Sequence, residues 1–186
     1  YLNQNFYDSE LVLEPASGQL FGEHNFEHFE VKEGAAADST IEGSTESMDA
    51  EVQKVTQLVI SHARWHPEES LLVVTASRSH AERIAKLVEQ EVASQPSIAE
   101  FFDAHGRERF DCVTMGELTH RLADRVIFSV GFGRTPEGRI SQTLGDFNSE
   151  SAGRWMVNQI VSARKRLSVV SCYNFEDFAG GSLPEN

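Results

Sequence analysis

Two kinds of hydrophobic pattern alternate along the chain, short continuous apolar runs and apolar positions at helical spacing. The continuous or loosely alternating runs predict five short strands. These strands cover residues 26–31, 71–75, 110–114, 125–130 and 167–172. The run 71–75 is apolar almost throughout, as expected for a strand that is buried on both faces of a sheet.

The positions at helical spacing predict four helices between these strands. The first covers 48–63 and is stopped by Pro67, and the second follows a cap at Ser77 or Ser79. The third covers 96–105, with Pro96 in its first turn. Strands that alternate with helices predict an α/β domain with a mostly parallel sheet and helices on both faces.

The fourth predicted helix covers 149–165 and ends in a basic cluster, Arg164, Lys165 and Arg166. Positive charge at the end of a helix complements its dipole, which favours a structural role for this cluster. Positions 162 and 164 of a helix point about 200° apart. We therefore expect Arg164 to pair with a group on the domain's own surface and to make no contact with nucleotide.

Length and composition indicate one domain without a membrane span. The 186 residues suit a single domain, covering 1–186, with loops at 34–46 and 131–148. No apolar run approaches the roughly 18–20 residues that cross a bilayer, and no secretory leader precedes the first strand. We expect a cytoplasmic protein without membrane contact, and a piece of a longer chain, since the sequence opens in mid-pattern.

Charge is distributed very unevenly. The net charge is −13, and residues 1–51 contribute −11 of it, with twelve acidic residues and Lys32. The remaining residues are therefore nearly neutral and leave room for a local basic surface. The candidate contacts for nucleic acid or phosphate are Arg121, Arg125, Arg134 and Arg139.

Several catalytic and metal-binding motifs are absent from the sequence. No G-x-x-x-x-G-K-[ST] loop for a nucleoside triphosphate and no G-x-S-x-G elbow of a hydrolase occur. The pairs His24/His28 and His62/His66 have helical spacing, but neither has a third ligand at a fixed distance, so we expect no metal site. The glycines after residue 130 lack the spacing and the helix of a dinucleotide fingerprint.

Three segments nevertheless resemble a specific family. The segments 123–133, 145–148 and 162–171 are similar, in this order, to the second RecA-like domain of superfamily 1 helicases of the Upf-like group. Asn3, Phe6, Tyr7, Leu11 and Pro15, and further on Glu51 and Val55, also resemble that group. The resemblance implies a RecA-like domain of the P-loop NTPase type.

The positions that carry chemistry in that family differ here. The family's Gln, Gly and Glu fall on Thr119, His120 and Leu122, and its cleft arginine falls on Ser162. Arginines that reach a transferred phosphoryl group raise rates by about 10³–10⁵, which serine cannot do. We therefore assign no catalytic residue to this chain.

The resemblance implies two alternative functions. The first is the second motor domain of a helicase-like ATPase, which contributes to an ATP cleft and a nucleic-acid path and is inactive alone. The second is a catalytically dead pseudo-helicase domain that serves as an interaction scaffold. The first implies a preceding RecA-like domain and single-stranded DNA or RNA as partners. ATP and magnesium would then belong to the longer protein, and this chain alone would hold no cofactor.

Overall fold

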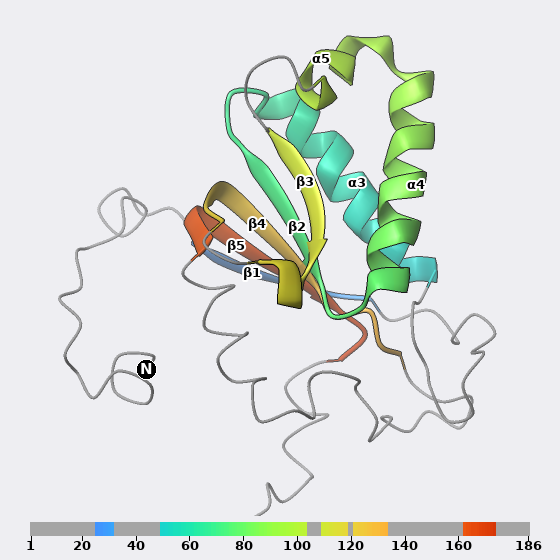
Figure 1. Ribbon diagram of the computed structural model, residues 1–186, viewed down its shortest axis with the longest axis vertical. Helices are drawn as coiled ribbons and strands as arrows, with labels where there is room; N and C mark the ends of the chain where they lie inside the picture. Colours follow the sequence, from blue (N-terminus) through green and yellow to red (C-terminus); the bar gives the residue numbers. More distant parts are fainter. Residues whose placement is uncertain (1–24, 32–48, 104–108, 119–120, 134–161, 174–186) are drawn as a thin grey trace, which may run out of the picture.

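The computed structural model describes residues 25–31, 49–103, 109–118, 121–133 and 162–173, and Figure 1 shows their arrangement. The strands are β1 (Phe26–Glu30), β2 (Leu71–Thr75), β3 (Phe110–Thr114), β4 (Ala123–Ser129) and β5 (Ala163–Ser171). The helices are α3 (Asp49–Trp65), α4 (Arg78–Ser94) and α5 (Ala99–Phe102), with short 3₁₀ turns η1 (Pro96–Ile98) and η2 (Met115–Glu117).

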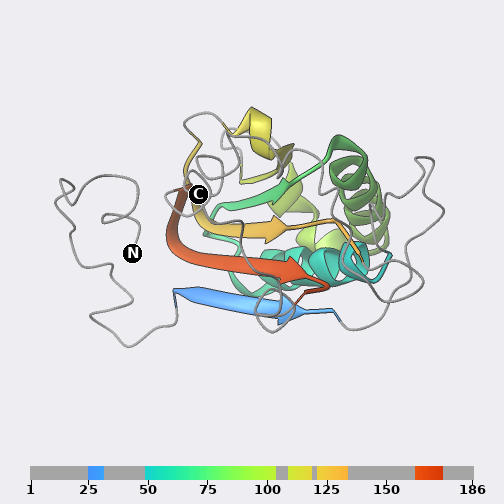
Figure 2. The ribbon, with the colours of Figure 1, turned by 90° about the horizontal axis from the view of Figure 1, so that it is seen from below.

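The five strands form one sheet in the order β1-β5-β4-β2-β3, and every neighbouring pair is parallel. Figure 2 shows the strands pointing the same way, with β1 at one edge. Parallel strands must be joined by crossovers, which is why helices separate β1, β2 and β3 along the chain. The predicted α/β class with a mostly parallel sheet is confirmed.

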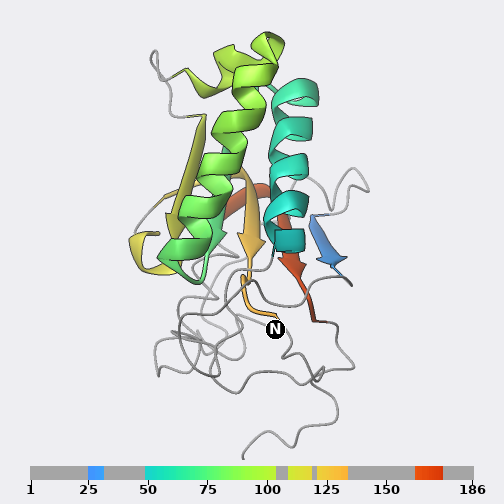
Figure 3. The same cartoon turned by 90° about the vertical axis from the view of Figure 1, so that its right-hand side faces the viewer.

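Helices α3 and α4 lie side by side on one face of the sheet (Figure 3). Val55 and Val59 of α3 and Ile84 of α4 are fully buried there against Val73 and Val170 of the sheet. The opposite face buries Val74, Val126 and Phe128, and among the described elements η2 packs there through Met115. Both faces of the central strands are therefore apolar, as the continuous run in β2 predicts.

The helix boundaries follow local sequence signals. The hydroxyl of Ser77 caps α4 by accepting the backbone N–H of His80 at 3.3 Å. Helix α3 extends to Trp65, two residues beyond the predicted end, and Pro67 follows it. The third helix, predicted over 96–105, is shorter than expected. The 3₁₀ turn η1 begins at Pro96, and α5 follows it and ends at Phe102.

The predicted end of the fourth helix is wrong. Strand β5 already begins at Ala163, so Arg164, Lys165 and Arg166 lie in a strand and cannot complement a helix dipole. The register shifts there, from Ala123 opposite Ala163 to Arg125 opposite Arg166, so β5 holds one extra residue. The helical argument that separated positions 162 and 164 by about 200° fails for the same reason. Of the rest of the predicted helix, Ser162 is helical, and residues 149–161 lie outside the described residues.

None of the described helices is long and apolar enough to cross a membrane. The predicted loop at 34–46 lies outside the described residues, as do Asn3, Phe6, Tyr7, Leu11 and Pro15.

Candidate functional site

The topology marks one place where ligands bind in open α/β sheets. Strands β2 and β4 are neighbours, but the chain continues from β2 towards β3 and from β4 towards β5, in opposite directions. Such a switch point leaves a crevice outside the carboxyl ends of the two strands. Here these ends are Thr75 and Ser129, and both side chains are fully buried.

The imidazole of His80 fills the space next to these ends. His80 belongs to the first turn of α4, is fully buried, and its Nε2 lies 2.7 Å from Oγ of Ser129. Thr75 donates its hydroxyl to the carbonyl of Ser77 at 2.8 Å, and Ser77 caps the same helix. The turn after β2 thus fixes the start of α4, which places His80 against β4.

A buried carboxylate completes this arrangement. Oε1 of Glu51, in the first turn of α3, accepts hydrogen bonds from Ser129 Oγ at 2.7 Å and from the backbone N–H of Gly131 at 2.8 Å. Cys172, directly after β5, directs its Sγ to Oε2 of Glu51 at 3.6 Å. We call Glu51, His80, Ser129 and Gly131 the carboxyl-edge network, and it joins α3, α4 and the end of β4.

The charge state of this network depends on Glu51. Burial raises the pKa of Glu51 to about 7, and the hydrogen bonds from Gly131 and Ser129 act in the opposite direction. His80 Nε2 lies 4.0 Å from Glu51 Oε1. When Glu51 is ionised, the hydroxyl of Ser129 donates its hydrogen bond to Glu51. Ser129 Oγ then accepts from His80, so Nε2 of His80 carries the proton of that hydrogen bond.

Gly131 has a backbone conformation that other residues rarely adopt. Its φ is +74°, and a Cβ at this position would lie 2.8 Å from Cδ2 of His80. The close approach allows its N–H to reach Glu51. Further along, Tyr173 donates its hydroxyl to the carbonyl of Gly133 at 2.8 Å and so connects the end of β5 to the same loop.

The carboxyl-edge network contains serine, histidine and glutamate but does not form a nucleophilic site. Ser129 lies between His80 and Glu51, whereas a catalytic triad has the histidine in the middle. All three side chains are inaccessible to solvent. The arrangement can hold a proton and fix three elements, but it cannot reach a substrate.

Of the four positions at which the family carries chemistry, the two that the structure describes lie apart from this network. Ser162 is buried directly before β5, and Leu122, which is 57% exposed, lies directly before β4, so both are near the amino ends of the strands. Thr119 and His120 lie outside the described residues. The assignment of no catalytic residue to these positions stays a prediction.

The four candidate nucleic-acid contacts are only partly described. Arg121 forms an ion pair with Asp111, and Arg125 forms one with Glu69, both near the amino ends of the strands. Arg134 and Arg139 lie outside the described residues. A contact face formed by the four arginines therefore stays a prediction. Two of the four already form ion pairs with carboxylates.

The basic cluster of β5 also faces carboxylates. Nζ of Lys165 lies 2.8 Å from Glu69 and 3.7 Å from Asp124, and Nη1 of Arg166 lies 3.2 Å from Glu27. Burial acts to raise the pKa of Asp124, but hydrogen bonds from Ser70 and the charges of Lys165 and Arg164 hold it below its ordinary value. Arg164 is exposed, and its charge contributes to the lowered pKa of Asp124. The expected pairing of Arg164 with a group on the domain's own surface stays a prediction.

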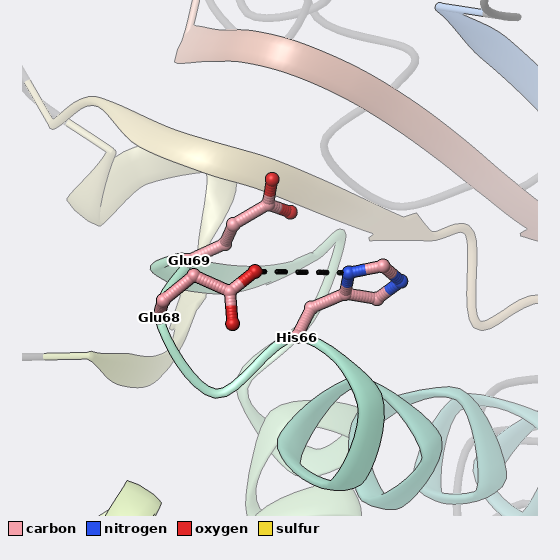
Figure 4. Close-up of side chains that lie close together, drawn as sticks. All are labelled: His66, Glu68 and Glu69. Carbon is pink, nitrogen blue, oxygen red and sulfur yellow. Dashed lines mark ion pairs between the residues drawn. The ribbon is translucent and has the colours of Figure 1, made fainter.

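One group of side chains has the composition of a metal site. The ligand atoms of His66, Glu68 and Glu69, in the turn between α3 and β2, lie within 4.8 Å of one another (Figure 4). Lys165 and Arg125 already bind the two carboxylate oxygens of Glu69. A divalent cation would lie beside two positive charges, so this geometry favours an ion-pair cluster over a metal centre.

Comparison with known proteins supports the fold alone. No family model matches the sequence, and no curated protein matches it. The crystal structure of the HK97 bacteriophage large terminase is similar to this chain, with a TM-score of 0.50 over 87% of its length at 12% identity. The fold is RecA-like. The chain spans about a third (33%) of that terminase, and this identity says nothing of a shared activity.

Sequence reasoning missed the carboxyl-edge network, although a signal exists. Glu51 precedes Val55 and Val59 at intervals of four, and His80 precedes Ile84 and Val88 in the same way. Each polar residue thus extends the buried stripe of its helix by one turn. A titratable residue at such a position must find partners when it is buried.

Proposed function

We propose that this chain is the second RecA-like motor domain of a superfamily 1 helicase-like ATPase and is inactive on its own. The observation that carries the proposal is the RecA-like sheet, five parallel strands with a switch point between β2 and β4. The segments that resemble the family support it, because 123–133 and 162–171 contain the paired strands β4 and β5. The assignment to the Upf-like group rests on the sequence resemblance.

The closed carboxyl edge explains why the domain would need a partner. His80, Ser129 and Glu51 fill the switch-point crevice, and the sequence has no phosphate-binding loop. ATP and magnesium would therefore be held chiefly by another RecA-like domain. This chain would supply the facing wall of the cleft and part of a path for single-stranded DNA or RNA.

The alternative is a pseudo-helicase domain that keeps the fold as an interaction scaffold. The observation that favours it is Ser162, which is 4% exposed at the position of the family's cleft arginine. A small buried hydroxyl there can reach no phosphate across a cleft. The two functions differ in whether the assembled protein turns over ATP.

The test is ATP hydrolysis by a longer protein that contains this domain and a domain with a phosphate-binding loop. The motor function predicts hydrolysis that single-stranded nucleic acid stimulates and that deletion of residues 1–186 abolishes. Hydrolysis that is unchanged by the deletion contradicts the motor function and favours the scaffold. A point variant in the phosphate-binding loop of the other domain serves as the control for contaminating ATPase.

A further inference from the structure

A groove opens at the amino edge of the sheet, at the other end of the strands from the carboxyl-edge network. It has a volume of about 280 Å³ and lies between the second half of α3 and the middle of β4 and β5, with Leu71 at the start of β2. Its lining includes Leu58 and Trp65 of α3 and Ile127 and Ser168 of the sheet. We call this cavity the amino-edge groove.

Trp65 is the most exposed large apolar side chain among the described residues. It is the last residue of α3, lines the amino-edge groove and is 69% exposed. An indole left in water beside a cavity offers a flat surface on which an unpaired base can stack. Such stacking contributes about 1–3 kcal/mol per base and tolerates any base.

Two arginines line the same groove from the sheet. Arg125 of β4 and Arg166 of β5 are opposite each other in the parallel register, and their side chains are 22% and 28% exposed. Arg125 uses Nε in its ion pair with Glu69, and Arg166 uses Nη1 in its pair with Glu27. Among the described residues the other nitrogens of both guanidiniums have no partner, and the planar fork suits phosphate oxygens.

The charges of the groove favour an anionic group over a cation. The charged side chains that line the groove are Arg125, Arg166 and Glu27, and His62 and His66 line it as well. Burial holds the pKa of His62 below its ordinary value, and the neutral ring donates to the carbonyl of Glu69 at 2.9 Å. The lining thus holds two arginines and one carboxylate, and Glu69, just outside the lining, pairs with Arg125.

We propose that the amino-edge groove binds one nucleotide of a single-stranded nucleic acid, with its base on Trp65 and its phosphate on Arg125 and Arg166. The inference rests on the proposed function only in taking nucleic acid as the partner. It adds a contact at the edge of the sheet opposite the switch point. It requires neither ATP nor a second domain.

The experiment measures binding of a short fluorescein-labelled oligothymidylate to the 186-residue chain by fluorescence anisotropy at low salt. Trp65→Ala should weaken binding about 5- to 150-fold, and Trp65→Phe should retain most of it. Arg166→Ala should weaken binding and lower the slope of log K against log salt by about one. Arg83→Ala is the matched control, because Arg83 also pairs with a carboxylate, Asp49, but lies on α4 away from the groove.

Trp65 and Arg83 are partly exposed, so both variants should keep the melting temperature of the parent chain. Absence of binding by the parent chain at low salt overturns the proposal. Binding that Trp65→Ala leaves unchanged, or that Arg83→Ala weakens equally, overturns it as well. Because no ATP is present, loss of ATPase function in the longer protein leaves this result unaffected, and the two proposals can fail separately.

Discussion

The backbone of Gly131 packs directly against the imidazole of His80. A Cβ on Gly131 would lie 2.8 Å from Cδ2 and 2.9 Å from Cγ of the ring. The imidazole cannot move aside freely, since it is fully buried and bonded to Ser129 at 2.7 Å. The loop after β4 and the first turn of α4 therefore constrain each other.

Gly131→Ala should lower the free energy of unfolding by about 1–3 kcal/mol, because it adds a steric clash to a backbone with positive φ. Urea denaturation measures the change. Gly116→Ala is the control, since a Cβ at Gly116 would meet nothing within 4 Å, and it should change stability by less than about 0.5 kcal/mol. Equal effects of the two variants would show that Gly131 and His80 do not constrain each other.

Glu51 should make the stability of the protein depend on pH. Its pKa of about 7 in the folded state lies above the ordinary 4.5, so the folded protein keeps a proton that the unfolded chain loses. The stability that this group contributes is full below pH 4.5 and falls as the pH rises to about 7.

Glu51→Gln removes this dependence and keeps a side-chain oxygen that can accept from Ser129 and Gly131. From about pH 5 to about pH 8, the stability of the variant relative to the parent should rise by on the order of 2–3 kcal/mol. Urea titrations of both proteins at the two pH values measure it. If the difference in stability between the two proteins stays constant with pH, Glu51 is not the group that keeps the proton.

Glu69 should matter more for stability than its neighbour Glu68. Glu69 is 12% exposed and pairs with Arg125 and Lys165, whereas Glu68 is 69% exposed. Glu69→Ala leaves a partly buried arginine without its carboxylate, and we expect a loss of about 1–3 kcal/mol. Glu68→Ala should cost less than about 0.5 kcal/mol. Thermal unfolding compares them, and similar melting temperatures would contradict the ion-pair cluster.

The acidic N-terminal third should weaken any binding of nucleic acid. Residues 1–51 carry −11 of the net charge of −13, which repels phosphate at long range. Deletion of 34–46 removes Asp38, Glu42 and Glu46 and should strengthen oligonucleotide binding at low salt, with a smaller gain at high salt. Anisotropy titrations at two salt concentrations measure this, and weaker binding after the deletion would refute it.

Most of the sheet could be predicted because its strands are buried runs between clear boundaries. The bounds of β2 and β3 match the prediction to the residue, and α4 begins after Ser77, one of its two predicted caps. The start of β5 could not be predicted, because Arg164, Lys165 and Arg166 suit a helix end as well as a strand with a bulge. Only pairing with β4 decides between the two.

The candidate sites were harder to predict than the strands. Burial of Glu51 and His80 depends on their contacts with Ser129 at the end of β4, which lies 78 and 49 residues away along the chain. The groove beside Trp65 likewise forms only when β4 and β5 place Arg125 opposite Arg166. The resemblance to helicases indicated the fold and included Glu51, Ser129 and Gly131, but it did not show that these residues bond to one another. The described positions at which it marked a loss of chemistry, Ser162 and Leu122, lie outside both sites.

The most direct test of the account is ATP hydrolysis, measured with the 186-residue chain and with a longer protein that adds a domain with a phosphate-binding loop. The account predicts background turnover by the chain alone and turnover by the longer protein that single-stranded nucleic acid stimulates. ATP turnover by the chain alone that a point variant within it removes would contradict the account. So would turnover by the longer protein that persists unchanged after deletion of residues 1–186.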